Sequence, residues 1–184
     1  ELRMNGDAVK LGLQICEDLW DDEYDLKVCR VLCEKGAELL INISASPFHV
    51  NRLDERLVLI RDKVEDLKCN FIYCNLVGAQ DELVFDGLSC IVNPAGEVVA
   101  LSPAFEENVQ VVNLEKGDPV KIPALSEENQ IFHALSLGIK DYFQKTGHTQ
   151  AVIGLSGGID SALTAVIAQN ALGSDNVLGI AMPS

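Results

Sequence analysis

The sequence predicts an α/β fold made of two parts that follow one another along the chain. Strand-like apolar runs alternate with amphipathic helical segments up to Val77, and a β-hairpin pattern follows. A second alternation of helix and strand begins after a stretch rich in glycine, proline and charge. The chain has 184 residues, 48% of them hydrophobic and 23% charged, so it is long enough for one core and part of another.

The first part opens with three strands separated by two helices. The strands are predicted over residues 9–15, 38–43 and 71–77, and the middle one lacks polar alternation, as in a strand covered on both faces. The first helix is predicted over residues 23–35, ending at Gly36. The second helix carries apolar residues at steps of four and three, namely Leu53, Leu57, Ile60, Val64 and Leu67.

Antiparallel pairing is predicted after Gly78. Residues 88–92 and 97–101 flank the turn Asn93-Pro-Ala-Gly96 and predict a β-hairpin. Residues 108–114 predict one more strand. Together with the first three strands, these elements indicate a mixed, layered α/β sheet.

The linker between the two parts is predicted near residues 115–119, where glycine, proline and charge gather. We assign residues 1–117 to the first part and residues 118–184 to the linker and the second part. Ser126 is expected to cap a helix. One face of that helix carries Ile131, Leu135, Ile139 and Tyr142.

The second part continues with a strand over residues 150–155, a glycine loop, a helix over about 160–171 and a strand over 177–181. Two βα units begin and neither is completed before Ser184. The first residue is Glu1 rather than Met. We therefore expect the chain to be a piece of a longer polypeptide, with a truncated second domain.

The net charge of −14 argues against a nucleic-acid or anionic-membrane partner, because no cluster of Lys and Arg offsets it. No apolar run approaches the ~20 residues that span a bilayer, and the first residues do not form a signal peptide. We expect a cytoplasmic protein that binds neither membrane nor nucleic acid.

The six cysteines show no Cys-x-x-Cys spacing and no histidine at ligand spacing. We interpret five of them as small buried apolar residues of a reduced protein: Cys29, Cys33, Cys69, Cys74 and Cys90. The acidic run after Cys16 could suggest a metal site, but a solvated helix N-terminus accounts for it better. That run comprises Asp18, Asp21, Asp22, Glu23 and Asp25.

A phosphate-binding loop is indicated where a strand leads through Ser156-Gly-Gly158 into a helix. Glycines let backbone N–H groups approach a ligand closely, and the helix N-terminus adds its dipole. The hydroxyls of Ser156 and Ser161 can donate to phosphate oxygens, and Asp160 can hold Mg²⁺. The P-loop and Gly-x-Gly-x-x-Gly patterns are both absent. Two glycines alone would be structural, so the flanking serines and aspartate carry the functional interpretation.

The segment Ser156-Gly-Gly-Ile-Asp-Ser161 resembles the signature loop of the ATP pyrophosphatases. In that family the loop grips the pyrophosphate of ATP while a substrate oxygen attacks the α-phosphate, and a nitrogen nucleophile then breaks down the adenylate. The resemblance implies the start of a Rossmann-like doubly wound domain, with Asp160 on Mg²⁺. The ATP-binding residues it implies are Gly154, Leu155, Ser156, Gly157, Gly158, Ile159, Asp160 and Ser161.

A candidate nucleophile lies in Gln14-Ile-Cys-Glu-Asp-Leu-Trp20, where a thiol ends a buried strand. A nucleophilic cysteine needs its thiolate, a base and an oxyanion donor. A strand end followed by a tight turn exposes the sulfur and directs the next backbone N–H toward the oxyanion. The local sequence fits a buried cysteine before a turn equally well.

This cysteine elbow, with Asn42-Ile-Ser-Ala-Ser-Pro47 and the segment from Asn75 to Ser89, resembles the nitrilase superfamily. More narrowly, it resembles the glutaminase domain of glutamine-dependent NAD synthetases. The match covers residues ~8–114, and the synthetase match covers residues ~126–184. The conjunction of the two is more specific than either motif, and it implies that the first part is the C-terminal part of an αββα sandwich.

The resemblance implies that Cys16 attacks the glutamine carboxamide, releasing ammonia and leaving a thioester, with the N–H of Glu17 stabilising the oxyanion. Ser46 and Arg52 match positions that hold glutamine, and a guanidinium suits its α-carboxylate. From the residues alone, Arg52 also fits a solvated arginine at a helix start. The implied partners are glutamine, deamido-NAD⁺ and ATP, in a homo-oligomer. Another ATP-pyrophosphatase ligase, or a non-catalytic nitrilase-like assembly module, remains an alternative.

One departure from the nitrilase pattern concerns the general base. Nitrilase-type sites take a Glu base and an oxyanion Lys from elements that precede the cysteine. Only Lys10, six residues before Cys16, and Glu1 are present there, and neither fits. We therefore expect this chain alone to be inactive as a glutaminase, since the thiol stays mostly protonated near neutral pH without a base.

Overall fold

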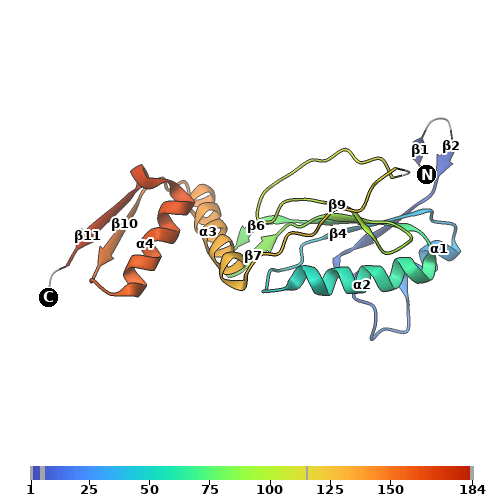
Figure 1. Ribbon diagram of the computed structural model, residues 1–184, viewed down its shortest axis with the longest axis horizontal. Helices are drawn as coiled ribbons and strands as arrows, with labels where there is room; N and C mark the ends of the chain where they lie inside the picture. Colours follow the sequence, from blue (N-terminus) through green and yellow to red (C-terminus); the bar gives the residue numbers. More distant parts are fainter. Residues whose placement is uncertain (1, 5–6, 115, 183–184) are drawn as a thin grey trace. The chain divides into compact units, whose positions relative to one another are not determined.

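The computed structural model describes residues 2–4, 7–114 and 116–182 and confirms the mixed α/β class (Figure 1). It divides into two compact units. The first comprises Glu1–Val77 with Phe85–Ala124, and the second comprises Gly78–Val84 with Leu125–Ser184.

A five-stranded sheet forms the centre of the first unit, in the order β3-β4-β5-β8-β9. The first three strands are parallel, and the last two form the predicted hairpin. Their bounds are β3 Leu11–Ile15, β4 Leu39–Ser44, β5 Asn70–Asn75, β8 Cys90–Val92 and β9 Val98–Leu101. Parallel neighbours end at one edge of a sheet, so the segments after β3, β4 and β5 lie close together.

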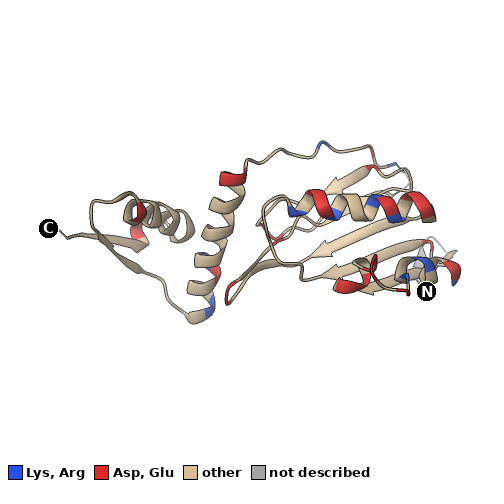
Figure 2. Cartoon of the chain, turned by 90° about the horizontal axis from the view of Figure 1, so that it is seen from below, with Lys and Arg blue, Asp and Glu red and all other residues tan. Residues whose placement is uncertain are grey.

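Two helices, α1 (Val28–Glu34) and α2 (Arg52–Leu67), lie on the same side of the sheet, as Figure 1 shows. α2 matches its prediction closely, and acidic and basic side chains alternate along it in Figure 2. α1 begins five residues later than predicted from residue 23. The intervening loop is held by the buried carboxylate of Asp21, which accepts from the backbone N of Val28 at 2.8 Å and from Lys63 at 2.5 Å.

The hydrophobic core fills one face of the sheet, between the strands and α2. Among its fully buried members are Leu40, Leu57, Ile60, Val64, Phe71 and Val92. The opposite face is open within the described residues, where Leu13 is 61% exposed and Ile43 57%. The prediction that the middle strand is covered on both faces is therefore wrong for the described part of the chain.

Residues 108–114 do not form the predicted strand. Val109 and Val111 are almost fully exposed there, and the side chain of Gln110 donates to the carbonyl of Leu101 at 3.2 Å. Apolar β-branched residues favour a strand only where a neighbouring backbone offers ladder hydrogen bonds, and no described strand pairs with this segment.

Four short strands form two further two-stranded sheets. β1 (Leu2–Met4) pairs antiparallel with β2 (Asp7–Val9). The predicted strand over residues 71–77 ends as β5 at Asn75, and β6 (Val77–Gln80) begins separately. β6 forms a two-stranded sheet with β7 (Leu83–Asp86).

The second unit contains two helices and a parallel pair of strands, as predicted. Ser126 caps α3 by accepting from the backbone N of Asn129 at 3.3 Å. The elements are α3 Glu127–Thr146, β10 Ala151–Leu155, α4 Ile159–Leu172, the short helix η2 Ser174–Asn176 and β11 Val177–Ala181.

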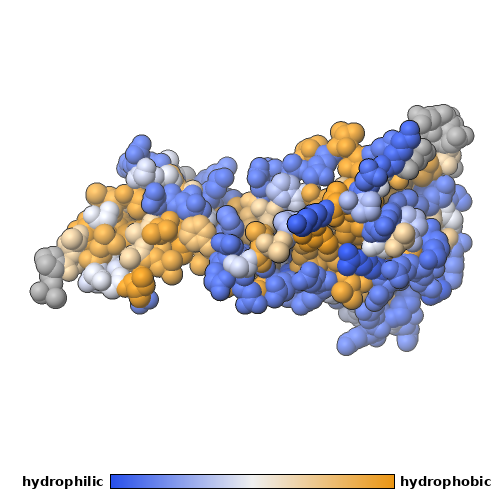
Figure 3. Space-filling view, in the orientation of Figure 1, coloured by the Kyte–Doolittle hydropathy of each residue, from blue (hydrophilic) through white to orange (hydrophobic). Residues whose placement is uncertain are grey.

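The face of α3 that the sequence marked as apolar is largely solvent-exposed. Leu135 is 48% exposed and Tyr142 63%, while Ala134 and Leu137 on another face are buried. Figure 3 shows apolar residues gathered on the surface of this unit. None of the described helices combines the length and hydropathy that crossing a bilayer requires.

Candidate active site

Cys16 lies where β3 ends and the short helix η1 (Cys16–Leu19) begins. Its φ is +45°, a left-handed conformation that non-glycine residues rarely adopt. Such backbone strain is characteristic of functional turns. The thiol residue is half-buried. The predicted elbow is therefore present as a sharp strand-to-turn junction.

Two side chains hold this elbow in place. The Asp18 carboxylate accepts from the backbone N of Ile15 at 2.8 Å, which closes the turn. The side chain of Asn42, fully buried on the neighbouring strand β4, donates to the carbonyl of Cys16 at 3.4 Å. Asn42 in turn accepts from the hydroxyl of Ser44 at 2.5 Å. The strand end is thus tied to the adjacent strand by buried polar groups.

Ser46 and Arg52, the predicted glutamine-holding residues, lie against each other. The Arg52 Nε donates to the Ser46 hydroxyl at 3.4 Å, and Nη1 pairs with the Glu55 carboxylate at 2.8 Å. Ser46 is 2% exposed. The Arg52 hydrogen bond lowers the pKa of Glu55, helped by nearby His49. The structure thus shows that Arg52 can pair with a carboxylate beside Ser46.

Trp20 connects this pair to the cysteine elbow. The guanidinium carbon of Arg52 lies 4.1 Å from the centre of the Trp20 ring, in cation–π geometry. Trp20 follows η1 directly, and its backbone N donates to the carbonyl of Glu17 at 2.8 Å. The turn after Cys16 and the start of α2 therefore meet at one place.

A buried polar network behind Ser46 was missed by the sequence reasoning. Arg56 on α2 is fully buried and pairs with Asp86 at 2.9 Å. Asn75, at the end of β5, donates to the same Asp86 oxygen at 3.1 Å. Burial raises the pKa of the Asp86 carboxyl, and the Arg56 guanidinium opposes that shift. Arg56 could have been noticed, because it occupies the buried stripe of α2 three residues after Leu53.

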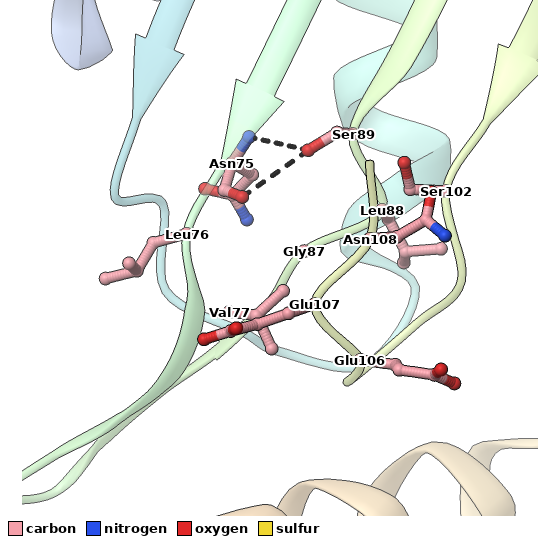
Figure 4. Close-up of a pocket in the computed structure, with 10 residues that line it drawn as sticks. All are labelled: Asn75, Leu76, Val77, Gly87, Leu88, Ser89, Ser102, Glu106, Glu107 and Asn108. Carbon is pink, nitrogen blue, oxygen red and sulfur yellow. Dashed lines mark hydrogen bonds between the residues drawn. The ribbon is translucent and has the colours of Figure 1, made fainter. Parts of the chain in front are cut away.

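A pocket of about 240 Å³ lies next to this network (Figure 4). In Figure 4, Asn75 and Ser89 are joined at its wall: the backbone N of Asn75 donates to the Ser89 hydroxyl at 3.0 Å. Glu106 and Glu107 line its other side. Ser46 and Arg52 are not among its lining residues, so this pocket is separate from the predicted glutamine contacts.

Lys10 remains a poor candidate for the oxyanion donor. Lys10 precedes β3, at the end of the strand opposite Cys16, and its side chain lies against Gly36. Its backbone N donates to Glu38 at 3.2 Å. Glu1 lies outside the described residues.

The acidic run after Cys16 is more structured than predicted. Asp18 closes the elbow, and Asp21 is 2% exposed with Lys63 and the first turn of α1 as partners. The interpretation of the whole run as a solvated helix N-terminus is therefore wrong for these two residues. The described residues hold no group of three or more His, Cys, Asp or Glu side chains that could bind a metal ion.

All six cysteines are free thiols. Burial raises the pKa of Cys90 and of Cys69 to about 12, so these two resist forming thiolates. Cys29 is also buried, with its pKa raised by burial, which agrees with the apolar interpretation. Cys74 departs from that interpretation, because it is exposed on the open face of the sheet.

The predicted phosphate loop joins β10 to α4. Gly157 has φ +85° and open space around it, and Gly158 is the N-cap of α4 without a side-chain cap. The Ser156 and Ser161 hydroxyls lie 3.3 Å apart, and Ser161 Oγ donates to the Gly158 carbonyl at 3.0 Å. Backbone N–H groups, two hydroxyls and the exposed Asp160 thus border one strand-to-helix turn.

Both halves of the chain match known protein families. A model described as carbon-nitrogen hydrolase matches residues 3–119, and one described as NAD synthase matches residues 131–184. The glutamine-dependent NAD(+) synthetase of Rhodobacter capsulatus is 42% identical over 96% of this chain and 32% of that protein. That of Aquifex aeolicus is 38% identical over 95% of this chain and 37% of that protein.

The chain is also similar to solved structures of glutamine-dependent NAD+ synthetases. The glutamine-dependent NAD+ synthetase of Acinetobacter baumannii, solved in complex with ADP, superimposes with a TM-score of 0.87 at 31% identity. The match covers 99% of this chain and 34% of that one. The Cytophaga hutchinsonii enzyme gives a TM-score of 0.65 at 28% identity, over 90% and 27%. The chain spans about a third of the length of the curated relatives it matches.

The match over residues 3–119 defines the class of the first part as carbon-nitrogen hydrolase, and the strained turn at Cys16 lies inside the matched region. The chain belongs to the carbon-nitrogen hydrolase family. An NAD synthase segment follows in the same chain, and over 95% or more of its length the chain is similar to glutamine-dependent NAD(+) synthetases.

Proposed function

We propose that the protein containing this chain makes NAD⁺ from deamido-NAD⁺, ATP and glutamine. The observation that carries the proposal is the joining, in one chain, of a carbon-nitrogen hydrolase segment with an NAD synthase segment. Ammonia made in the first part would be used in the second. A solved relative binds ADP, which supports a nucleotide site in such proteins.

In the first part, Cys16 would attack the carboxamide carbon of glutamine. A tetrahedral intermediate forms, its oxyanion accepting from the backbone N–H of Glu17. The carbon–nitrogen bond then breaks. The amide nitrogen takes up the proton that the thiol has lost and leaves as ammonia, and a glutamyl thioester remains. Water hydrolyses the thioester to glutamate and restores the thiol. Lys10 lies at the wrong end of its strand for a role here, so the base and the oxyanion lysine would come from other residues of the whole protein.

Ser46 and Arg52 would hold the amino-acid end of glutamine. Arg52 already donates to the Glu55 carboxylate at 2.8 Å and to the Ser46 hydroxyl at 3.4 Å, which supports a carboxylate ligand at this position. A free α-carboxylate can take the place of Glu55 and pair with the guanidinium in a bidentate manner. Glu55 is half-exposed and can move into solvent when the substrate binds.

In the second part, the turn after β10 would bind MgATP as a substrate complex. Mg²⁺ in nucleotide sites is bound by one or two carboxylates together with the substrate phosphates. A single exposed carboxylate at Asp160, next to free helix N–H groups, fits that arrangement. Backbone N–H groups from the loop would hold the pyrophosphate, with the Ser156 and Ser161 hydroxyls beside them.

Labelled glutamine tests the proposal on the full-length protein. With [amide-¹⁵N]glutamine, deamido-NAD⁺ and ATP, we expect labelled NAD⁺, AMP and pyrophosphate. Their absence from folded protein would refute the function. The Cys16→Ala variant should lose glutamine use and keep synthesis from added ammonia. Loss of both activities in that variant would show that Cys16 is structural.

A further inference from the structure

A buried ion pair lies directly behind the two residues proposed to hold glutamine. Arg56 on α2 is 0% exposed and donates from Nη1 to Asp86 Oδ1 at 2.9 Å. Asp86, the last residue of β7, is 2% exposed. A charge pair at such depth is weak evidence for stability, because its desolvation cost can exceed its attraction. Its presence needs another explanation.

The second arm of the Arg56 guanidinium reaches the backbone of the predicted site. Nη2 donates to the carbonyl of Ser46 at 3.0 Å. Asn75 holds the same residue from the other side, since its Oδ1 accepts from the Ser46 backbone N at 2.9 Å. Asn75 also donates to Asp86 at 3.1 Å. Both backbone polar groups of Ser46 are therefore held by side chains that Asp86 joins together.

Ser46 lies outside the β-sheet, so no hydrogen bonds between strands hold its backbone. Residues 45–49 follow β4 and precede α2 without regular secondary structure. Ser46 is nevertheless buried, and its hydroxyl accepts from Arg52 Nε at 3.4 Å. The position of that hydroxyl relative to Arg52 is thus set by the side-chain bonds of Arg56 and Asn75.

The turn after Asp86 is strained. Gly87 has φ +66° and Leu88 has φ +52°, and the latter is uncommon for a leucine. A Cβ on Gly87 would lie 2.6 Å from the Val77 side chain, so this backbone approach requires glycine. Figure 4 shows the turn beside Asn75.

We propose that Arg56 and Asp86 are positioning residues for glutamine: they fix the Ser46 backbone and, through Ser46, the Arg52 side chain. The inference rests on the proposed function and adds residues that touch no substrate. The predicted effect falls on glutamine binding, because the elbow at Cys16 has its own supports in Asp18 and Asn42.

Steady-state kinetics of the full-length protein test this inference. Arg56→Lys cannot donate to Asp86 and Ser46 with the same fork, so we expect the KM for glutamine to rise about tenfold. Three other quantities should stay within about twofold of wild type, because the change affects glutamine binding and not the elbow at Cys16. They are the kcat at saturating glutamine, synthesis from added ammonia and the rate at which iodoacetamide alkylates Cys16. Asp86→Asn leaves the buried Arg56 charge unpaired, so it should raise the same KM and also lower the melting temperature.

Two controls separate positioning from stability. Arg61, on the same helix, donates to the carbonyl of Gly96 at 3.0 Å, so Arg61→Lys removes a comparable bond away from Ser46. It should leave the KM for glutamine unchanged. The double variant Arg56→Met with Asp86→Leu leaves no unpaired buried charge. It should melt near the wild-type temperature and keep the raised KM.

The two proposals fail in different ways. If wild-type protein uses glutamine and the Arg56→Lys variant keeps its KM within twofold, the positioning role is wrong and the proposed function stands. The positioning role is also wrong if the double variant regains both stability and the wild-type KM. If folded wild-type protein does not hydrolyse glutamine, the proposed function fails, and the positioning role fails with it.

Discussion

The guanidinium carbon of Arg52 lies 4.1 Å from the centre of the Trp20 ring, which ties the start of α2 to the turn after Cys16. This contact orients Arg52 from one side, and its bond to Ser46 orients it from another. A long, flexible arginine side chain would otherwise sample many conformations. The guanidinium that we propose to hold glutamine is therefore preorganised by residues from two parts of the chain.

Replacing Trp20 with leucine should weaken glutamine binding in the full-length protein. The cation–π contact contributes roughly 0.5–2 kcal/mol, so the KM for glutamine should rise between about twofold and thirtyfold. Trp20→Phe keeps an aromatic face and should show a smaller rise. Synthesis of NAD⁺ from ammonia is the control activity. A Trp20→Leu variant with an unchanged KM would show that the stacking does not orient Arg52.

Arg52→Lys tests whether the guanidinium recognises the α-carboxylate. Lysine keeps the positive charge but loses bidentate pairing, so the KM for glutamine should rise at least about tenfold. Hydrolysis of a simple amide without an α-carboxylate should change little. If both substrates are affected equally, Arg52 acts on the elbow rather than on the carboxylate.

The sequence predicted the strands, α2 and the second unit well, because apolar periodicity and glycine or proline stops are local signals. The false strand over residues 108–114 shows the limit, since pairing depends on a neighbouring backbone that residues such as Val109 do not reveal. The start of α1 was predicted too early for a similar reason, namely a contact between residues far apart in the sequence. One oxygen of the Asp21 carboxylate accepts from the first backbone N–H of α1, and the other accepts from Lys63, far along the chain.

The site was predictable in part. Cys16, Ser46 and Arg52 came from a resemblance, and the structure brings Ser46 and Arg52 into contact. Their roles remain predictions. The position of Arg56 in the apolar stripe of α2 was a signal that it is buried, but its pairing with Asp86, 30 residues away, was not visible in the sequence. Only the fold reveals that the two are buried together.

Thiol reactivity should differ sharply between buried and exposed cysteines. At pH 8 the native protein should leave Cys90 and Cys69 unmodified by iodoacetamide, because burial raises the pKa of both to about 12. Exposed Cys74 should react slowly, since burial of its sulfur raises its pKa too. In urea all three should react. Mass spectrometry of digested protein gives the extent at each site, and rapid native labelling of Cys90 would contradict the burial.

The same raised pKa values predict a loss of stability in alkali. The pKa of Cys90 rises from 9.0 in its ordinary environment to about 12 in the folded protein. The unfolded chain therefore releases its proton first, and the contribution to stability is complete below about pH 9 and lost as the pH rises toward 12. Urea midpoints between pH 8 and pH 11 measure this. Cys90→Ala should flatten the decline, although the smaller side chain lowers stability at every pH.

Gly157→Ala tests the phosphate loop against a matched glycine in the same unit. Gly157 (φ +85°) and Gly147 (φ +76°) both have a positive φ, so alanine at either position introduces backbone strain, on the order of 1 kcal/mol. No atom lies within 4 Å of a Cβ added to Gly157, so no clash adds to that strain. Both variants should therefore lose similar thermal stability. Only Gly157→Ala should raise the KM for ATP, because it alone shifts the N–H groups that we propose to hold the pyrophosphate. Glutamine hydrolysis should persist in both variants. Equal KM values for ATP in the two variants would show that this loop does not bind the nucleotide.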